Sequence, residues 1–240
     1  MIILREMLGM STAFFKITYS CDIIMRYSAN MRISKRMRGY MKGRLLIVLN
    51  IVIIILELIA FVHDCFAFGV SLFEWYTVDS NVLQLVVSIM VLFYVLNGKD
   101  IPGFVTVLHF VSAVGLTVTF LIAAFVLAPE GGVEYYFLEN VAPINHFIGP
   151  LLSVISILFF EKVEKLPVKI IAWPAGVTLV YGVICLVLNA VNVLDGPYFF
   201  LKIHEQPMGT IILWFGIIAV LCVALAFLFY KVKWRKVRGN

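Results

Sequence analysis

An acidic side chain and a histidine lie inside long apolar stretches of this sequence, where ionisable groups are rare. Glu57 stands in the apolar stretch 45–62, and His109 stands in the stretch 104–127. If lipid surrounds these stretches, placing an ionisable side chain there costs about 3 kcal/mol even on the most lenient scale. Such a side chain therefore needs a partner, a proton or a function. One hypothesis is proton-coupled transport, in which Glu57 and His109 form a proton-coupling pair.

Uncharged polar side chains also recur at helical spacing. Asn50, Glu57 and Asp64 follow one another at intervals of seven residues, which places them along one face of a helix. A second polar stripe contains Thr77, Ser80, Asn81, Gln84 and Ser88. Lipid offers such groups no hydrogen-bond partner, so both stripes are expected to face the interior of a helix bundle. They form either part of a substrate path or contacts that hold neighbouring helices together.

Several distant segments supply polar side chains at one expected depth. Counting about 1.5 Å of rise per residue from the cytoplasmic helix ends places this layer in the outer third of the membrane. It contains His63, Asp64, Thr77, Asp79, Ser80, Asn81, Asn145, His146, Asn189 and Asp195. We therefore predict a pocket near the outer leaflet. Two simpler interpretations stay open: Thr77 caps a helix whose positive end Asp79 complements, or His146 is an interfacial residue bonded to a loop carbonyl.

Membrane-spanning helices must position these residues. The chain has 240 residues, of which 62% are hydrophobic and 14% charged, whereas a soluble domain carries about 25% charged residues. A span needs roughly 20 mostly apolar residues, and six stretches qualify: 45–62, 78–96, 104–127, 141–160, 168–193 and 208–230. They are too long and too uniformly apolar for barrel strands. The predicted fold is an all-α membrane protein, a bundle of six transmembrane helices.

The distribution of charge sets the expected orientation. If the residues before 45 are cytoplasmic, all of the 19 Lys and Arg residues except Lys202 fall on the cytoplasmic side. Cytoplasmic loops carry such an excess of Lys and Arg, so both termini are expected inside the cell. The basic residues cluster at the chain ends and in short loops. This pattern excludes a nucleic-acid-binding surface in spite of the net charge of +5.

Three regions follow from this topology: a basic segment 1–44, a six-helix membrane domain 45–230 and a basic tail 231–240. The first segment is either an amphipathic helix on the inner leaflet or an extension upstream of a natural start at Met41. The four histidines and four cysteines show no metal-ligand spacing, so no metal or other cofactor is expected.

Three short motifs resemble those of a bacterial six-span membrane family of unknown role. They are residues 74–83, with an aromatic-Thr-x-x-Ser-Asn core, the motif Asn145-His146-x-x-x-Pro150, and residues 194–198 (LDGPY). The resemblance covers roughly residues 45–230. That family is distantly similar to the androgen-induced and androgen-dependent TFPI-regulating membrane proteins. Those proteins hydrolyse fatty acid esters of hydroxy fatty acids within the membrane, using a threonine and a histidine.

The resemblance implies an intramembrane lipid-ester hydrolase of the bacterial plasma membrane, with Thr77 as nucleophile and His146 as general acid/base. A threonine hydroxyl is a poor nucleophile until a base takes its proton. The near-neutral pKa of an unperturbed histidine suits it to accept and return that proton. The substrate would be a lipid-like ester that arrives sideways from the membrane lipids.

Other polar residues would support the reaction. Asn81, Asn145 or a backbone amide at a helix start could stabilise the oxyanion, and one such donor is worth about 3 kcal/mol. Either Asp64 or Asp195 could orient the histidine. The other residues predicted to support the pocket are Glu57, Ser80, Gln84 and Asn189. Two alternative functions stay open: a small proton-coupled transporter or channel, and an accessory membrane protein without turnover.

Overall fold

The computed structural model describes residues 41–235 and divides the chain into two units, residues 1–44 and 45–240. Of the first unit it describes residues 41–44, which are helical. The predicted amphipathic or extraneous character of the basic segment therefore falls mostly on residues outside the described part, as does the end of the basic tail, 236–240. The second unit holds the predicted membrane domain.

Residues 41–235 form helices and loops, and no strand occurs among them. The first described helix covers residues 41–68 and tightens into the 3-10 helix η1 (Gly69–Glu74). The elements that follow are α2 (Tyr76–Leu96), α3 (Gly103–Ile122), the π-helix η2 (Ala123–Leu127), α4 (Ala128–Gly131), α5 (Val133–Phe137), the π-helix η3 (Ile144–Ile148), α6 (Gly149–Ile155), the π-helix η4 (Ser156–Phe160), the 3-10 helix η5 (Val168–Ile171), α7 (Ala172–Ala190), the 3-10 helix η6 (Phe199–Leu201) and α8 (Met208–Arg235).

Five helices in the described part are long and apolar enough to cross a membrane, and they agree with five of the six predicted stretches. These are Met41–Glu74, Tyr76–Leu96, Gly103–Gly131, Val168–Ala190 and Met208–Trp234. The multi-pass helical architecture is thereby confirmed. The sixth stretch forms the shorter apolar helix Ile144–Phe160. At 1.5 Å per residue it reaches about 25 Å, less than the roughly 30 Å of a bilayer core.

Prolines mark two of the helix starts. Pro102 directly precedes α3, and Pro167 directly precedes η5, both in extended conformation. A proline fixes its own φ and has no N–H to donate, so it is tolerated at the start of a helix and not within one. The predicted stretches 104–127 and 168–193 begin just after these two prolines, so the structure confirms both starts to within two residues.

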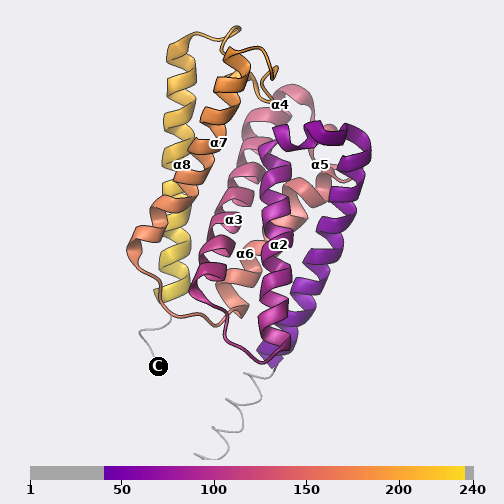
Figure 1. Ribbon diagram of the computed structural model, residues 1–240, viewed down its shortest axis with the longest axis vertical. Helices are drawn as coiled ribbons and strands as arrows, with labels where there is room; N and C mark the ends of the chain where they lie inside the picture. The colour runs from indigo at the N-terminus through magenta and orange to yellow at the C-terminus, as the bar shows by residue number, and fades with distance from the viewer. Residues whose placement is uncertain (1–40, 236–240) are drawn as a thin grey trace, which may run out of the picture. The chain divides into compact units, whose positions relative to one another are not determined.

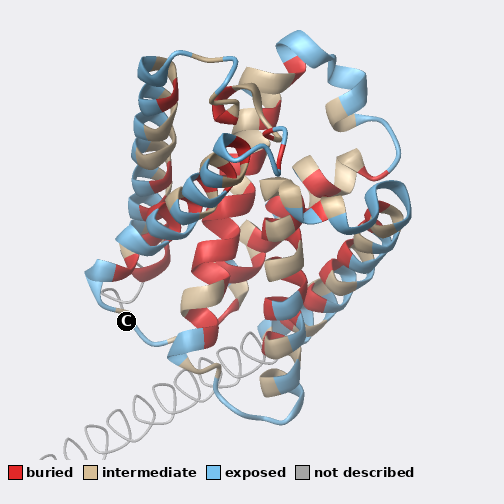
Figure 2. Ribbon diagram, turned by 45° about the horizontal axis from the view of Figure 1, so that its top comes forward, coloured by how far each residue is buried: buried red, intermediate tan, exposed pale blue. Residues whose placement is uncertain are grey.

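Helix α3 lies at the centre of the second unit and contacts α2, α6, α7 and α8 (Figure 1). Its buried residues include Phe110, Ala113 and Val114, which belong to one apolar cluster with Cys222 and Ala226 of α8. Figure 2 shows that buried positions concentrate on the central helices. This buried apolar surface packs the last helix, α8, against the central helix α3.

The outer faces of α7 and α8 are apolar and unprotected by protein. Val180 is 60% exposed, Ile212 is 65% exposed and Val220 is 70% exposed. Contiguous apolar surface of this kind is rare on soluble monomers. It is the surface expected where lipid replaces water as the solvent.

Both predicted polar stripes point into the bundle. Asn50, Glu57 and Asp64 are 0%, 1% and 4% exposed, and Gln84 of α2 is completely buried. Ser80, Asn81 and Ser88 are buried as well, whereas Thr77 at the start of the stripe is half-buried. The stripe interpretation is therefore confirmed, and each polar group needs a partner inside the protein.

Replacing Gly115 of α3 by valine is expected to destabilise the bundle. A Cβ at this position would lie 2.9 Å from the hydroxyl of Tyr76, which is hydrogen-bonded to Thr178 at 2.7 Å. Overpacking of this kind costs about 1–3 kcal/mol. A thermal melt in detergent should therefore show a lower Tm for Gly115→Val. The control is Gly176→Val in α7, where a Cβ meets nothing within 4 Å; equal losses in the two variants would contradict the prediction.

Candidate functional site

A cavity of about 430 Å³ lies where the start of α2, the end of the first helix, α4, α5, η3 and the loop after α7 meet. The polar side chains that line it are Asp64, Thr77, Glu130, Tyr135, Tyr136, Asn145, His146 and Tyr198. Thr77 and His146, the two residues implied as nucleophile and base, thus face one space although a helical hairpin separates them in sequence. Asp64 and Asn145 join them as predicted.

Thr77 is the second residue of α2 and lies within the helix. The N-cap is Trp75, which has extended dihedral angles and forms no side-chain cap hydrogen bond. The interpretation of Thr77 as the cap is therefore wrong, although Asp79 does lie in the first turn. The Thr77 carbonyl accepts hydrogen bonds from Ser80 Oγ at 3.0 Å and Asn81 Nδ2 at 2.8 Å. These bonds fix the backbone that carries the Thr77 hydroxyl.

Tyr198 is a site residue that sequence reasoning missed. Its hydroxyl interacts with both the side chain and the backbone of Thr77. Burial raises the pKa of Tyr198 to about 12, so the hydroxyl keeps its proton at neutral pH and remains a donor. The ring packs edge-on against Trp75, with centroids 5.8 Å apart. The position of Tyr198 at the end of the third motif, residues 194–198, was the available signal in the sequence.

His146 is held by a backbone carbonyl. Its Nδ1 donates a hydrogen bond to the carbonyl oxygen of Tyr136 at 2.8 Å. A carbonyl only accepts hydrogen bonds, so Nδ1 carries the proton and Nε2 keeps its lone pair as a base. The rings of Tyr136 and Phe137 pack edge-on against the imidazole at centroid distances of 5.9 and 6.0 Å. The predicted bond to a loop carbonyl is thus close to what is found, although the carbonyl belongs to the short helix α5.

The carboxylates proposed to orient the histidine have other partners. Asp64 accepts a hydrogen bond from Asn145 Nδ2 at 3.0 Å and lies 3.1 Å from His63 Nδ1. The side chain of Asp195 is 92% exposed and pairs with Lys202 at 3.4 Å. The expectation that Asp64 or Asp195 orients His146 is corrected, because Tyr136 already occupies Nδ1.

The two asparagines expected to stabilise an oxyanion are also engaged. Asn81 donates to the carbonyls of Thr77 and Asn145, the latter at 3.2 Å. Asn145 donates to Asp64. Because their amide nitrogens are bonded within the protein, the hydroxyl of Tyr198 is the better-placed donor beside Thr77.

Two further predicted residues form hydrogen bonds between the segments that surround the cavity. Ser80 Oγ lies 3.3 Å from Thr119 Oγ1 and links α2 to α3. Asn189, near the end of α7, donates to the carbonyl of Leu194 at 2.8 Å and accepts from the N–H of Ile203 at 2.7 Å. Asn189 therefore fixes both ends of the loop that carries Tyr198.

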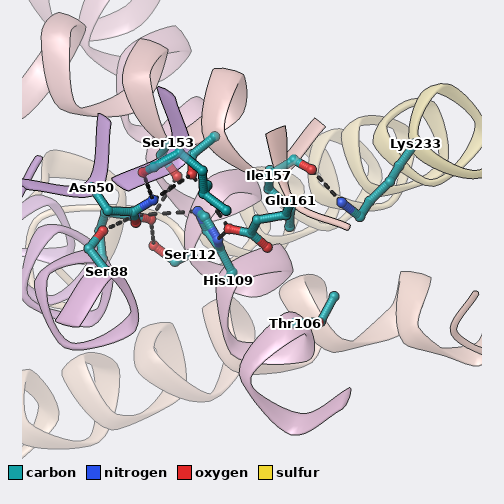
Figure 3. A network of polar contacts seen from close by, with 12 residues as sticks. Asn50, Ser88, Thr106, His109, Ser112, Ser153, Ile157, Glu161 and Lys233 are labelled. Atoms are coloured by element: carbon teal, nitrogen blue, oxygen red, sulfur yellow. Dashed lines mark hydrogen bonds and ion pairs between the residues drawn. The ribbon is translucent and has the colours of Figure 1, made fainter. Parts of the chain in front are cut away.

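Gln84 belongs to a separate polar network with residues of α2, α3 and α6. Figure 3 labels its partners Ser88, Ser112, Ser153 and His109. Its Oε1 accepts from Ser112 at 2.7 Å and from Ser153 at 2.6 Å. Its Nε2 donates to Ser88 at 2.9 Å and lies 3.3 Å from His109 Nε2. Gln84 therefore joins α2, α3 and α6 and does not line the cavity.

His109 has a partner that the sequence did not indicate. Its Nδ1 lies 2.5 Å from Glu161 Oε1, and both side chains are completely buried. Lys233 of α8 completes the group by donating to the carbonyl of Ile157 and interacting electrostatically with Glu161 (Figure 3). The hypothesis of a pair between Glu57 and His109 is thus corrected: the carboxylate paired with His109 is Glu161.

An apolar pocket adjoins the cavity. It shares Thr77, Leu127 and Tyr198 with the cavity, and its other walls come from α3, α7 and α8, including Val118, Leu179, Phe215 and Ile218. Thr77 therefore lies at the boundary between a polar space and an apolar one. That arrangement suits a molecule with a polar group attached to a hydrocarbon chain.

Comparisons with known proteins do not name this site. No family model matches the chain, and searches of curated proteins and of solved structures each found no match. The function must therefore be argued from the geometry itself.

Removing the Glu161 carboxylate is expected to destabilise the protein strongly. Glu161→Ala would leave His109 and the buried Lys233 without their acidic partner, and breaking a buried pair in this way costs about 3–5 kcal/mol. The measurement is the Tm in detergent beside that of Glu164→Ala, whose side chain is exposed. Similar Tm values for the two variants would show that the buried pair adds nothing to stability.

Proposed function

We propose that this protein is an intramembrane lipid-ester hydrolase in which Thr77 is the nucleophile and His146 the general acid/base. The observation that carries the proposal is that both residues line one cavity, at the point where it meets an apolar pocket. The proposal also agrees with the resemblance to the Thr/His hydrolases, which selects the same two residues. No metal or organic cofactor takes part in it.

The reaction would proceed by acyl transfer. His146 Nε2 takes the proton of the Thr77 hydroxyl while Thr77 Oγ1 attacks the ester carbonyl carbon. The tetrahedral intermediate collapses, the alkoxide leaves with the proton from His146, and the acyl group stays on Thr77. His146 then deprotonates a water molecule that hydrolyses the acyl-threonine and returns the proton to Oγ1. The Tyr136 carbonyl stabilises the imidazolium through its bond to Nδ1.

The hydroxyl of Tyr198 would stabilise the oxyanion of the intermediate. It is protonated at neutral pH and already lies against Thr77. The apolar pocket beside Thr77, with a volume of about 50 Å³, would receive the part of the acyl chain next to the ester, and the polar cavity would receive the leaving alcohol and the water. A lipid-like ester in the surrounding membrane lipids is the substrate class that fits both spaces.

The topology belongs to the same proposal. We infer six membrane helices, with Ile144–Phe160 as the short sixth member and both termini in the cytoplasm of a bacterium. The distribution of Lys and Arg supports this orientation. The cavity would then lie in the outer third of the plasma membrane, within reach of the outer leaflet.

Hydrolysis of a panel of long-chain esters by the detergent-purified protein tests the proposal. Thr77→Ala and His146→Ala should each lower kcat by about 1,000-fold or more, because each removes a group that makes or transfers the acyl bond. Thr77→Ser should retain measurable turnover. All variants are first checked for an unchanged size-exclusion profile.

A matched control separates chemistry from folding. Thr210→Ala changes the same residue type as Thr77 outside the cavity and should leave kcat unchanged. An inert wild type, or undiminished activity in the Thr77 and His146 variants, would contradict the hydrolase proposal and favour a non-catalytic accessory role.

Tyr198→Phe gives an independent prediction on the oxyanion. Loss of one positioned donor costs about 100- to 1,000-fold in kcat, with a smaller effect on KM, because the bond strengthens in the transition state. Steady-state kinetics of Tyr198→Phe beside Tyr94→Phe, which lies in α2 away from the cavity, provide the measurement. A change confined to KM would remove Tyr198 from this role.

A further inference from the structure

Glu57 is a buried carboxyl group that the proposed hydrolysis does not use. Its side chain is 1% exposed, and neither of its carboxylate oxygens has a hydrogen-bond partner among the described residues. Leaving a carboxylate unpaired in this position is costly, because neither protein nor water compensates its charge. Glu57 therefore requires either a proton or a ligand that supplies positive charge, and a proton would itself be a donor with no acceptor among the described residues.

The surroundings of Glu57 present further oxygen atoms and little positive charge. Three oxygens converge on the face of Gly149 that lacks a side chain. A Cβ there would lie 2.6 Å from Glu57 Oε1, 2.9 Å from the carbonyl oxygen of Ile144 and 3.2 Å from Asn81 Oδ1. Because Gly149 has no side chain, the position between these three oxygens is open, and we call this position the cradle.

Hydrogen bonds fix the direction of these oxygens. Both donors of the Asn81 amide are bonded to carbonyls, at 2.8 Å to Thr77 and 3.2 Å to Asn145. Its Oδ1 consequently faces the cradle, and it has no partner among the described residues. The carbonyl of Ile144 accepts one hydrogen bond, from the Gly149 N–H across the π turn, and therefore keeps a second lone pair.

Charged groups of the bundle do not neutralise Glu57. Asp64, seven residues further along the same helix, acts on Glu57 electrostatically and adds negative charge. The buried cation Lys233 interacts with Glu161, and His109 is paired with Glu161. Oxygen atoms that only accept match a hard cation. Among the three oxygens only that of Glu57 carries a charge, which balances a monovalent ion.

We propose that Glu57, Asn81 and the Ile144 carbonyl form a sodium-ion site against Gly149, in the interior of the bundle. Carbonyls of irregular helix turns coordinate Na⁺ in other membrane proteins, and η3 supplies one here. Asn145, which directly follows Ile144 in the chain, lies in the wall of the cavity, so the ion would reach the site from that side. The sodium site does not depend on the proposed hydrolysis, and each proposal can be refuted without the other.

Binding of Na⁺ also ties together three segments. Glu57 comes from the first described helix, Asn81 from α2 and Ile144 from η3. A ligand that binds the folded state and not the unfolded one raises the Tm in proportion to the logarithm of its concentration above Kd. Sodium should therefore stabilise the purified protein.

The test is a thermal melt of the detergent-purified full chain in NaCl and in choline chloride at equal ionic strength. We expect the wild-type Tm to rise with Na⁺ by about 5 °C at concentrations well above Kd. Glu57→Gln should abolish the rise, and Gly149→Ala should weaken Na⁺ affinity about tenfold or more by filling the cradle. Glu164→Gln, an exposed carboxylate, should respond like the wild type.

Two outcomes would overturn the proposal. Equal wild-type Tm values in Na⁺ and choline would mean that Glu57 carries a proton and no metal ion. An undiminished Na⁺ response in Glu57→Gln would place the ion elsewhere. If a variant does not fold, binding of radioactive sodium to the wild type decides: retention that excess unlabelled Na⁺ displaces and choline does not supports the site, and no retention refutes it.

Discussion

The constraint on which this structure depends is that lipid provides no hydrogen bonds, so polar groups inside the bundle must satisfy one another. The side chain of Gln84 shows how. It contacts Ser88 of its own helix, Ser112 and His109 of α3, and Ser153 of α6. Since His109 in turn meets Glu161, and Glu161 interacts with Lys233 of α8, one set of polar contacts extends from α2 to the last helix. Apolar side chains of neighbouring helices can pack in several registers, whereas this set of polar contacts forms in only one register.

The same requirement organises the opposite end of the bundle. The Tyr181 hydroxyl donates to the carbonyl of Glu74 at 2.6 Å and accepts from the N–H of Tyr76 at 3.1 Å. The Tyr198 hydroxyl interacts with the backbone of the next residue, Thr77. Hydroxyls from α7 and from the loop after it thus perform the task that a capping side chain performs in most helices. Thr77 is held in place because the start of its helix is bonded to two distant segments.

Much of the fold could be read from the sequence, because apolar length, proline positions and helical spacing of polar residues are local properties. The helices and the burial of Asn50, Glu57 and Asp64 followed from them. The hydrogen-bond and ion-pair partners of the polar residues did not follow from these local properties. Glu161 comes directly after an apolar stretch and resembles a cytoplasmic loop residue, yet the π turn η4 brings it inward to His109. His146 is oriented by the Tyr136 carbonyl, and backbone carbonyls carry no signature in a sequence. The sequence does not distinguish Tyr198 from an interfacial aromatic residue. Its position beside Thr77 depends on the loop that Asn189 fixes.

The π-helices on either side of α6 bear on how the site can evolve. In η3 a hydrogen bond runs from the Gly149 N–H to the Ile144 carbonyl, five residues apart. Successive residues of an α-helix are about 100° apart around its axis. Loss of one residue from η3 would let the backbone close as an α-helix, while turning the residues before α6 by about a quarter of a circle. The histidine would leave the cavity and a neighbour would take its place, so a change in chain length alone could give this scaffold a different reacting group.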